Sequence, residues 1–415
     1  MAQLSFVRFK KNSYILIEGK DDTDRFFIIQ EGLVQVLKES EVVAEEGGNI
    51  LKAGDFLGVV PCMARQNQIE TAVAITDSVL IAVPYNQFSS LIAQNTPVAM
   101  KIIYSFSRKM RYLDEALTRI TLKKNVSPGL EHLFTIGEYY MRMGKIPLAV
   151  YAYYHFLKAL PQSKNAIRAK NNLIAIQSMG TKITDDMIGK NNEVSTRTYS
   201  GERMVFCECQ MGAELYIIQR GHVKITKIVD DNEVLLAVLK EGDMFGEMAL
   251  LENKPRSASA IVTEEGAQLL TVNYQNFKFL VSTQPQLIAS LTTAFAERIW
   301  SMYRQLDNTQ ITEPLEKMYD MLALQFEKTH IKPQAKAPYT FSFGPVELAN
   351  MCGIPQEKRA SAIAEFLEDP IIILENSKIK VTDQLELEKK ASYFKRMQQI
   401  EARRLEARAR SGMSW

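Results

Sequence analysis

The 415-residue sequence predicts a multidomain α+β protein with two antiparallel β-roll domains, a helical insert between them and a small C-terminal domain. Three observations predict this class. Strand-rich segments occur twice in the same order, the segment between the copies has helical periodicity, and the C-terminal part has the pattern of two short helices followed by two strands. The predicted domain boundaries are, in chain order, 1–124, 125–185, 193–308, 309–385 and 386–415.

An internal repeat gives the two β-rolls. Residues 27–32 (FIIQEG) return as residues 216–221 (YIIQRG), 189 positions later (27 to 216). LKAGD at Leu51 returns as LKEGD at Leu239, 188 positions later (51 to 239). Both copies alternate apolar and polar residues over short β-rich runs, as antiparallel strands with one buried face do. Self-similarity at a fixed spacing indicates a duplicated domain.

The segment between the copies, residues 131–177, is predicted to be helical, because apolar residues recur at three and four and its first proline is Pro147. It resembles a tetratricopeptide repeat, a helix-turn-helix unit, on these positions: Ile136, Gly137, Tyr140, Gly144, Ala149, Tyr153 and Pro161. One such repeat cannot bury its own face, so we expect it to pack on a neighbouring domain. A helical spacer with no peptide-binding role is the alternative.

The candidate binding site lies in the second copy, at residues 244–260 (MFGEMALLENKPRSASA). Gly246 and Glu247 join a turn glycine to a carboxylate, and Arg256 follows nine residues after the carboxylate, among small residues. A carboxylate can accept a hydrogen bond from a sugar hydroxyl, and a guanidinium neutralises a phosphate while donating to two of its oxygens. A short helical turn between them offers backbone N–H groups to the same anion. The arrangement suits a cyclic sugar phosphate; a surface loop in which Glu247 and Arg256 pair only with each other is the alternative.

This string closely resembles the phosphate-binding cassette of cyclic-nucleotide-binding domains, in which FGE, an apolar turn and PR followed by small residues occur in this order. The resemblance implies that Glu247 holds the ribose and that Arg256 and Ser257 hold the cyclic phosphate. It implies this ligand-binding set: Phe245, Gly246, Glu247, Met248, Ala249, Arg256, Ser257, Ala258 and Arg298. Either cyclic AMP or cyclic GMP fits these residues, and cyclic AMP is favoured on family grounds alone.

The first copy departs from this pattern. Aligned on the turn glycine, it has Val59 where the second copy has Glu247. Aligned on Ala72, it has Glu70 where the second copy has Arg256. A carboxylate would repel a cyclic phosphate, and Val59 cannot accept a ribose hydroxyl. We therefore expect the first roll to serve packing or dimerisation, with the binding of some other ligand as the alternative.

After the second roll, residues 286–306 are predicted to form one long helix with an apolar stripe at spacing three to four. The stripe consists of Leu291, Phe295, Ile299, Met302 and Leu306. The family resemblance implies that this helix lies over the nucleotide and pairs with its twin in a homodimer. Arg298, Trp300 and Tyr303 are the candidates for reaching the base, and the sequence does not choose among them. Trp300 as interface core is the alternative.

The C-terminal part has the layout of a helix-turn-helix: a helix at 347–351, Gly353 in the turn and Pro355 at the start of a second helix. A hairpin at 371–383 follows. The order and spacing resemble the winged helix of catabolite-activator-type (Crp/Fnr-like) regulators, in which the second helix enters the major groove. This implies double-stranded DNA as a partner, contacted by Gln356, Lys358 and Arg359.

The second helix also departs from that family. Ser361 and Ala362 stand where the family usually has an arginine, so a winged helix used for protein contact is the alternative. The tail, residues 386–415, has clustered arginines that would add phosphate contacts if the tail is an exposed helix. These arginines are Arg403, Arg404, Arg408 and Arg410.

Composition narrows the function classes. A net charge of +2 gives no overall field that would mark a nucleic-acid or membrane protein. Scattered cysteines favour a reducing cytoplasm, and no apolar run approaches the ~18 residues needed to span a bilayer. Cys207 and Cys209 would make half a metal site, but none of the four histidines stands at ligand spacing, so we expect no metal and interpret both as strand residues. No nucleophile–base pair or nucleotide-triphosphate loop is visible, so we expect no enzymatic activity.

The sequence therefore predicts a cytoplasmic, cyclic-nucleotide-responsive transcription regulator, with the ligand in the second roll coupled through the long helix to the winged helix. The alternative is a cyclic-nucleotide-sensing scaffold that acts on a protein partner without binding DNA. In a third interpretation the second roll is ligand-free as well.

Overall fold

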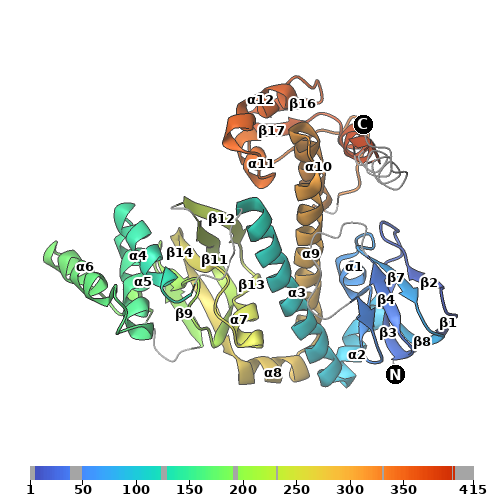
Figure 1. Cartoon of the computed structure of the whole chain (residues 1–415), viewed down its shortest axis with the longest axis horizontal. Coiled ribbons are helices and arrows are strands. Elements are labelled where there is room, and N and C mark those ends of the chain that lie inside the picture. The colour runs from blue at the N-terminus through green and yellow to red at the C-terminus, as the bar shows by residue number, and fades with distance from the viewer. Residues whose placement is uncertain are drawn as a thin grey trace, which may run out of the picture. The chain divides into compact units, whose positions relative to one another are not determined.

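The fold was analysed in a computed structural model that describes residues 5–37, 49–122, 129–189, 195–229, 232–329, 331–394 and 396–397. The chain divides into two compact units (Figure 1). The larger unit contains both β-rolls and the helices between them, and the smaller contains the C-terminal domain. The division falls after Glu115 in one long helix and after Ile299 in another, so each long helix begins in the larger unit.

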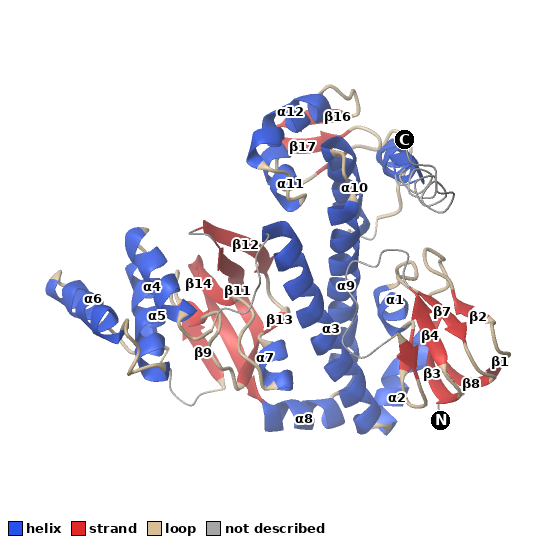
Figure 2. Ribbon diagram, viewed as in Figure 1, coloured by secondary structure: helices blue, strands red, loops and turns tan. Residues whose placement is uncertain are grey.

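The first roll consists of two antiparallel four-stranded sheets, shown as red arrows in Figure 2, with strand orders β1-β8-β3-β6 and β2-β7-β4-β5. Apolar residues on alternate positions face each other between the sheets, which is why Ile29, Val34 and Leu80 are buried. The strands are β1 (Ser5–Phe9), β2 (Tyr14–Leu16), β3 (Arg25–Glu31), β4 (Val34–Leu37), β5 (Ile50–Leu51), β6 (Phe56–Leu57), β7 (Thr71–Ala74) and β8 (Ser78–Pro84). The helices are α1 (Val59–Ala64), η1 (Tyr85–Gln87), α2 (Phe88–Gln94) and α3 (Thr96–Leu122).

The second roll is one six-stranded antiparallel sheet in which β10-β14-β11-β12 are neighbours, β13 pairs with β11 and β9 pairs with β14. Two long strands form its centre, with Glu214 opposite Asn273 at one end and Thr226 opposite Ser259 at the other. The strands are β9 (Thr196–Tyr199), β10 (Met204–Phe206), β11 (Glu214–Val229), β12 (Asn232–Leu239), β13 (Met244–Phe245) and β14 (Ser259–Asn273). The helices are α7 (Glu247–Glu252), α8 (Tyr274–Thr283) and α9 (Pro285–Gln310). The duplication of a β-roll is confirmed.

The predicted helical insert is confirmed as α4 (His132–Arg142), α5 (Ile146–Ala159) and α6 (Ala166–Ser178), followed by the turn η2 (Asp186–Ile188). A Cβ at Gly137 would lie 2.7 Å from the Tyr153 ring, so glycine is needed where α4 and α5 cross. As expected, the insert packs on the second roll. Its core continues into Met204 and Ile261, and the Tyr151 hydroxyl donates to the Val205 carbonyl at 3.1 Å.

Cys207 and Cys209 were interpreted as strand residues, and this was wrong: both follow β10, and Cys209 has φ 66° in the turn. Burial raises the pKa of both thiols, that of Cys209 to about 12. Among the described residues, no three histidine, cysteine or acidic side chains gather where they would hold an ion. None of the described helices is long and apolar enough to cross a membrane.

The smaller unit has the elements predicted for the C-terminal part, in the predicted order. They are α10 (Pro314–Glu327), β15 (Tyr339–Thr340), α11 (Pro345–Met351), α12 (Gln356–Leu367), β16 (Ile372–Glu375) and β17 (Lys378–Val381). The predicted hairpin turn is confirmed, because Asn376 and Ser377 both have positive φ (50° and 63°), as a two-residue hairpin turn requires. Residues 384–394 form a helix, and the tail arginines lie outside the described residues.

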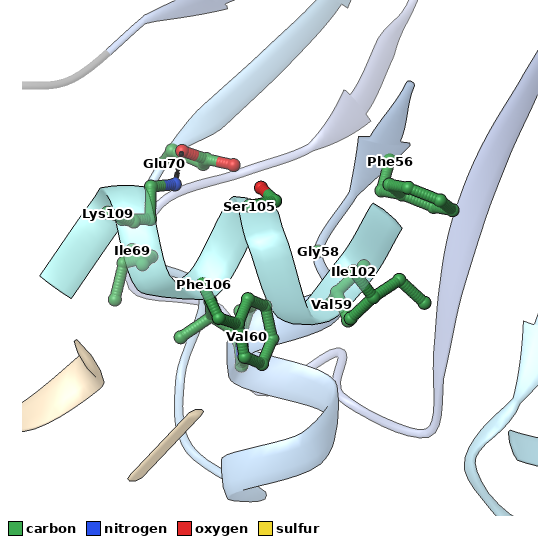
Figure 3. A pocket seen from close by; sticks show the side chains of 11 residues that line it. Phe56, Gly58, Val59, Val60, Ile69, Glu70, Ile102, Ser105, Phe106 and Lys109 are labelled. Carbon is green, nitrogen blue, oxygen red and sulfur yellow. Dashed lines mark ion pairs between the residues drawn. The ribbon is translucent and has the colours of Figure 1, made fainter. Parts of the chain in front are cut away.

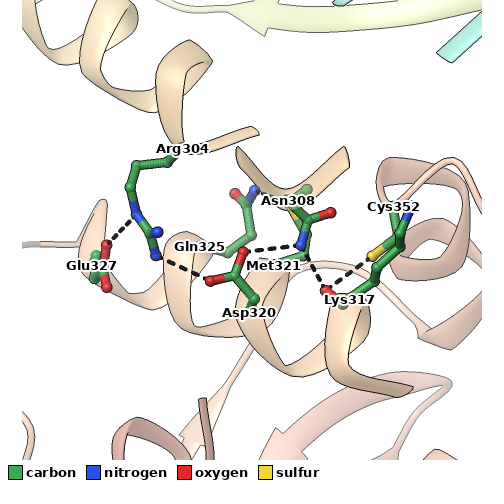
Figure 4. Close-up of polar contacts among 8 residues, drawn as sticks. All are labelled: Arg304, Asn308, Lys317, Asp320, Met321, Gln325, Glu327 and Cys352. Atoms are coloured by element: carbon green, nitrogen blue, oxygen red, sulfur yellow. Dashed lines mark hydrogen bonds and ion pairs between the residues drawn. The ribbon is translucent and has the colours of Figure 1, made fainter. Parts of the chain in front are cut away.

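A buried polar cluster fixes the junction between α9 and α10 within the smaller unit (Figure 4). Arg304 contacts Asp320 at 3.2 Å, and the Asn308 amide donates to the same carboxylate at 2.9 Å. The Cys352 thiol at the end of α11 donates to the Lys317 carbonyl on α10 at 3.4 Å. These bonds join the end of α9 to the helices of the C-terminal domain.

Candidate ligand site of the second β-roll

The site begins where β13 ends at Phe245. Gly246 has φ 80°, a conformation that favours glycine, and a Cβ there would lie 2.7 Å from the guanidinium of Arg256. The turn places Glu247 as the first residue of α7. As a result, Gly246, Glu247 and Arg256 lie together at one end of one short helix.

Arg256 is buried, and its guanidinium is held by backbone carbonyls. Nη1 donates to the Gly246 oxygen at 2.5 Å and Nη2 donates to the Glu214 oxygen at 2.7 Å. The guanidinium carbon lies 4.0 Å from the centre of the Phe206 ring. Burial lowers the pKa of Arg256, but an arginine stays protonated. Nε of Arg256 makes no hydrogen bond within the part of the chain that the structure describes. A buried positive charge with an unused N–H group is a favourable partner for an anion.

Glu247 is also buried, at 1% exposed, and its Oε1 makes no hydrogen bond among the described residues. The same oxygen lies 3.8 Å from Nη1 of Arg298 on α9. Glu247 therefore has a free acceptor that a sugar hydroxyl would satisfy. The pairing of Glu247 with Arg256, which was the alternative for this loop, receives no support, because the guanidinium donates to carbonyls and the carboxylate faces Arg298.

The remaining cassette residues surround these two groups. Ala249 and Ala258 are buried, whereas Met248 and Ser257 are half-buried. Ser259, two residues further on, has a structural role, because its hydroxyl accepts the Glu208 N–H at 3.0 Å.

Sequence reasoning missed four residues that shape the site, namely Phe206, Gly212, Glu214 and Tyr216, whereas it did predict Phe245. Phe206, Tyr216 and Phe245 form an aromatic cluster under the guanidinium, with Tyr216 stacked on Phe245 at 5.3 Å. Gly212 leaves room for Arg256, because a Cβ there would lie 2.3 Å from its guanidinium carbon. Glu214 contributes its backbone carbonyl. Phe206, Gly212, Glu214 and Tyr216 come from strands and turns outside residues 244–260. Of these four, only Gly212 is of a residue type that by itself indicates a close approach of the backbone to another group.

The first roll keeps the frame of this site. Its Gly58 has φ 67° and starts a six-residue helix, α1, as Gly246 starts α7. The Gln68 N–H donates to the Lys20 carbonyl, just as the Arg256 N–H donates to the Gln210 carbonyl, both at 2.9 Å.

A Cβ at Gly58 would meet the side chain of Gln68, as one at Gly246 would meet Arg256. Gln68 is therefore the counterpart of Arg256, and the prediction that Glu70 takes this place was wrong. The alignment on Ala72 was shifted by two residues, because Ala72 pairs across the sheet as Ala260 does, not as Ala258.

In the corrected alignment, too, the first roll lacks both the arginine and the carboxylate of the second roll's site. A neutral amide replaces the guanidinium, and Val59 is the first residue of α1, where α7 has Glu247. Figure 3 shows the cavity at this place, where Glu70 lies 3.8 Å from Lys109 of α3. Its volume of about 40 Å³ is far below the roughly 300 Å³ at which small-molecule pockets begin.

Of the three α9 candidates for reaching the base, Arg298 faces Glu247, with its Nη1 3.8 Å from Oε1, whereas Trp300 and Tyr303 are buried. Which of the three reaches the base stays a prediction. The apolar stripe is already covered within a single chain: Leu291, Phe295 and Ile299 are all buried. Pairing of α9 with a twin helix in a homodimer stays a prediction, because the burial of these side chains in one chain does not test it. A sequence cannot show which neighbours in its own chain will cover a helix face.

The predicted DNA-contacting residues lie at the start of α12. Gln356 and Lys358 are exposed, whereas Arg359 is half-buried and its Nε donates to the Ile354 carbonyl at 2.7 Å. Glu357 and Glu365 are exposed on the same helix, so its surface carries charges of both signs.

Comparison with known proteins agrees with the β-rolls. The family "Cyclic nucleotide-binding domain" matches residues 6–95 and 196–284. A "CRP-like cAMP-activated global transcriptional regulator" of Mycobacterium tuberculosis is 25% identical over 188 residues, 45% of this chain and 84% of that protein. The "Cyclic AMP receptor protein" of Thermus thermophilus is 26% identical over 194 residues, 46% of this chain and 86% of that protein.

A "cGMP-dependent protein kinase" of Caenorhabditis briggsae is 28% identical over 113 residues, 26% of this chain and 15% of that protein. The similarity to proteins named for cyclic nucleotides thus extends to both regulators and a kinase. Residues 6–95 and 196–284 of this chain are two copies of the cyclic nucleotide-binding domain.

Proposed function

We propose that the chain is a cyclic-nucleotide-responsive transcription regulator that binds one nucleotide, in its second roll. The observation that carries this proposal is that two charged groups, the Glu247 carboxylate and the Arg256 guanidinium, are buried together at the start of α7. In this proposal the Arg256 N–H groups that are not bonded to the carbonyls of Gly246 and Glu214 donate to a cyclic phosphate. Oε1 of Glu247, which makes no hydrogen bond among the described residues, accepts one from a ribose hydroxyl. Phe245, Gly246, Met248, Ala249, Ser257 and Ala258 complete the cassette.

Arg298 gives this site a route to the rest of the chain. A ribose hydroxyl bound to Glu247 would compete with Arg298, which stands 3.8 Å from the same oxygen. The ligand would thereby favour a different position of α9, and a ligand shifts a conformational equilibrium only through such differential contacts. Since α9 continues to Gln310 and is bonded there to α10, its movement would reach the C-terminal domain.

We propose cyclic AMP as the ligand, because the two bacterial regulators are named for it; the kinase match makes cyclic GMP the competitor. Calorimetric titration with both nucleotides tests this. Glu247→Gln removes one charge-assisted hydrogen bond, worth about 1.5–3 kcal/mol, and is expected to weaken binding by roughly 10- to 150-fold. Glu264→Gln, an exposed residue of β14, is the matched control and should leave the affinity unchanged. Equal affinity of the two variants would remove Glu247 from the site.

For the C-terminal domain we propose DNA binding through Gln356, Lys358 and Arg359, as a homodimer. An electrophoretic shift of genomic fragments is expected in the presence of nucleotide and should weaken as salt is raised. Lys358→Ala should weaken binding to all fragments and lower the salt slope by about 1. Lys170→Ala, an exposed lysine of α6, should change neither.

The mixed charge of α12 favours a second candidate, a nucleotide-sensing scaffold that acts on a protein partner. Absence of any shift at low salt, in protein that binds nucleotide, would decide for this candidate.

A further inference from the structure

We infer that α3, the helix after the first roll, positions the nucleotide cassette of the second roll, so that the first roll controls the affinity of the second. The inference rests on the proposed nucleotide site. Arg111 is the central positioning residue.

Three buried bonds join α3 to the cassette. Arg111 Nε contacts Glu252 Oε2 at 3.1 Å, and Arg111 Nη1 donates to the Pro255 carbonyl at 3.1 Å. The Ser107 hydroxyl donates to the other Glu252 oxygen at 2.9 Å. Glu252 is the last residue of α7, and Pro255 directly precedes Arg256. The helix therefore holds both ends of the loop that connects the two ligand-binding groups.

That loop also has local restraints: the Lys254 N–H donates to the Ala249 carbonyl at 3.3 Å, and Lys254 Nζ lies 3.5 Å from Glu252 Oε2. Asn253, Lys254 and Pro255 are exposed, and Asn253 has φ 52° at the end of α7. On its far side Pro255 forms a single bridge with Met211. Arg111 thus supplies the bonds that fix the loop from the α3 side, and its loss would loosen the start of the segment that carries Arg256.

Two further contacts attach α3 to the second roll away from the cassette. Lys227 of β11, at 2% exposed, pairs with Asp114 at 2.9 Å. The hydroxyls of Tyr104 and Tyr274 lie 2.8 Å apart, at the start of α8. Removing one partner of the buried charge pair would leave an uncompensated buried charge, so loss of either Lys227 or Asp114 is expected to weaken this attachment.

Another face of α3 closes the cavity of the first roll (Figure 3). Ile102 and Phe106 line that cavity, and Lys109 pairs there with Glu70. One helix therefore contacts both the small cavity of the first roll and the cassette of the second. In this inference the first roll, which lacks Arg256 and Glu247, fixes the position of α3, and α3 in turn fixes the cassette of the second roll.

The test is nucleotide binding by Arg111→Gln, measured by calorimetry well below the melting temperature of each variant. Expected is a dissociation constant at least about tenfold weaker, in the range of allosteric couplings. Arg108→Gln, an exposed arginine on the same helix, is the control and should bind as the wild type does. Arg111→Lys keeps the charge that faces Glu252 but loses the bond to the Pro255 carbonyl. Its affinity for nucleotide should lie between those of the wild type and Arg111→Gln.

Two readouts separate positioning from mere stabilisation. The losses caused by Arg111→Gln and Glu252→Gln should be non-additive in the double variant, because both remove the same bond. By reciprocity, nucleotide should slow amide hydrogen exchange in residues 104–115 of the wild type and not of Arg111→Gln. A variant with a lowered melting temperature but unchanged affinity would overturn the inference and leave the nucleotide site standing. A wild-type protein that binds no nucleotide would overturn the site itself, and the inference with it.

Discussion

Replacing Arg256 by glutamine, the residue at the equivalent position of the first roll, is expected to abolish nucleotide binding. The guanidinium offers two charge-assisted hydrogen bonds to a phosphate, each worth about 1.5–3 kcal/mol, so affinity should fall by at least about 100-fold. The change also tests the expectation that the first roll does not bind nucleotide, because it gives the second roll the amide of the first. The readout is the rise in melting temperature on adding nucleotide, which should disappear.

Gln68→Ala is the matched control, since Gln68 has the same place in the other copy. Its melting temperature without ligand should fall, because the buried amide donates to the Asp22 carbonyl, but the rise caused by nucleotide should persist. If nucleotide still raised the melting temperature of Arg256→Gln but no longer raised that of Gln68→Ala, the ligand would bind in the first roll. That result would contradict the proposal.

Gly212→Ala is expected to damage binding far more than stability. The new Cβ would lie 2.3 Å from Nε and 2.5 Å from Nη2 of Arg256, closer than any real contact. Because the obstacle is the end of a flexible side chain, the guanidinium can swing away and the fold survives. The swing breaks its bonds to the carbonyls of Gly246 and Glu214 and removes the charge from the site. Nucleotide affinity should fall at least about tenfold, which is about 1.4 kcal/mol.

Gly129→Ala is the control for the same chemical change, because a Cβ at Gly129 meets nothing within 4 Å. Unaltered affinity in Gly212→Ala would show that the position of Arg256 does not determine binding. A protein that no longer folds would show instead that the guanidinium cannot move away from the new Cβ.

The part of the site that could be predicted is the part that is contiguous in sequence. Gly246, Glu247 and Arg256 follow one another at fixed spacing, and the turn, the short helix and the loop translate that spacing directly into proximity. The helical insert and the duplicated roll were likewise predictable, because periodicity and repetition are local properties of a chain.

The predictions that failed depended on strand register, and the contacts that were missed join residues far apart in the sequence. A shift of two residues keeps alternating side chains on the same face of a strand, so an alignment on Ala72 looked sound while it placed Glu70 where Gln68 belongs. The contacts of Arg111 with Glu252 join residues 141 positions apart in the two copies, and no pattern in either copy indicates them. The same holds for the burial of the α9 stripe.

The number of nucleotides bound per chain tests the central claim most directly. The claim is that two rolls of one frame differ in two buried groups, the Arg256 guanidinium and the Glu247 carboxylate, which only the second roll has. Calorimetric titration of the full chain with cyclic AMP, and then with cyclic GMP, gives that number. We predict one site per chain for the preferred nucleotide. Two sites per chain, or no binding of either nucleotide, would contradict the account.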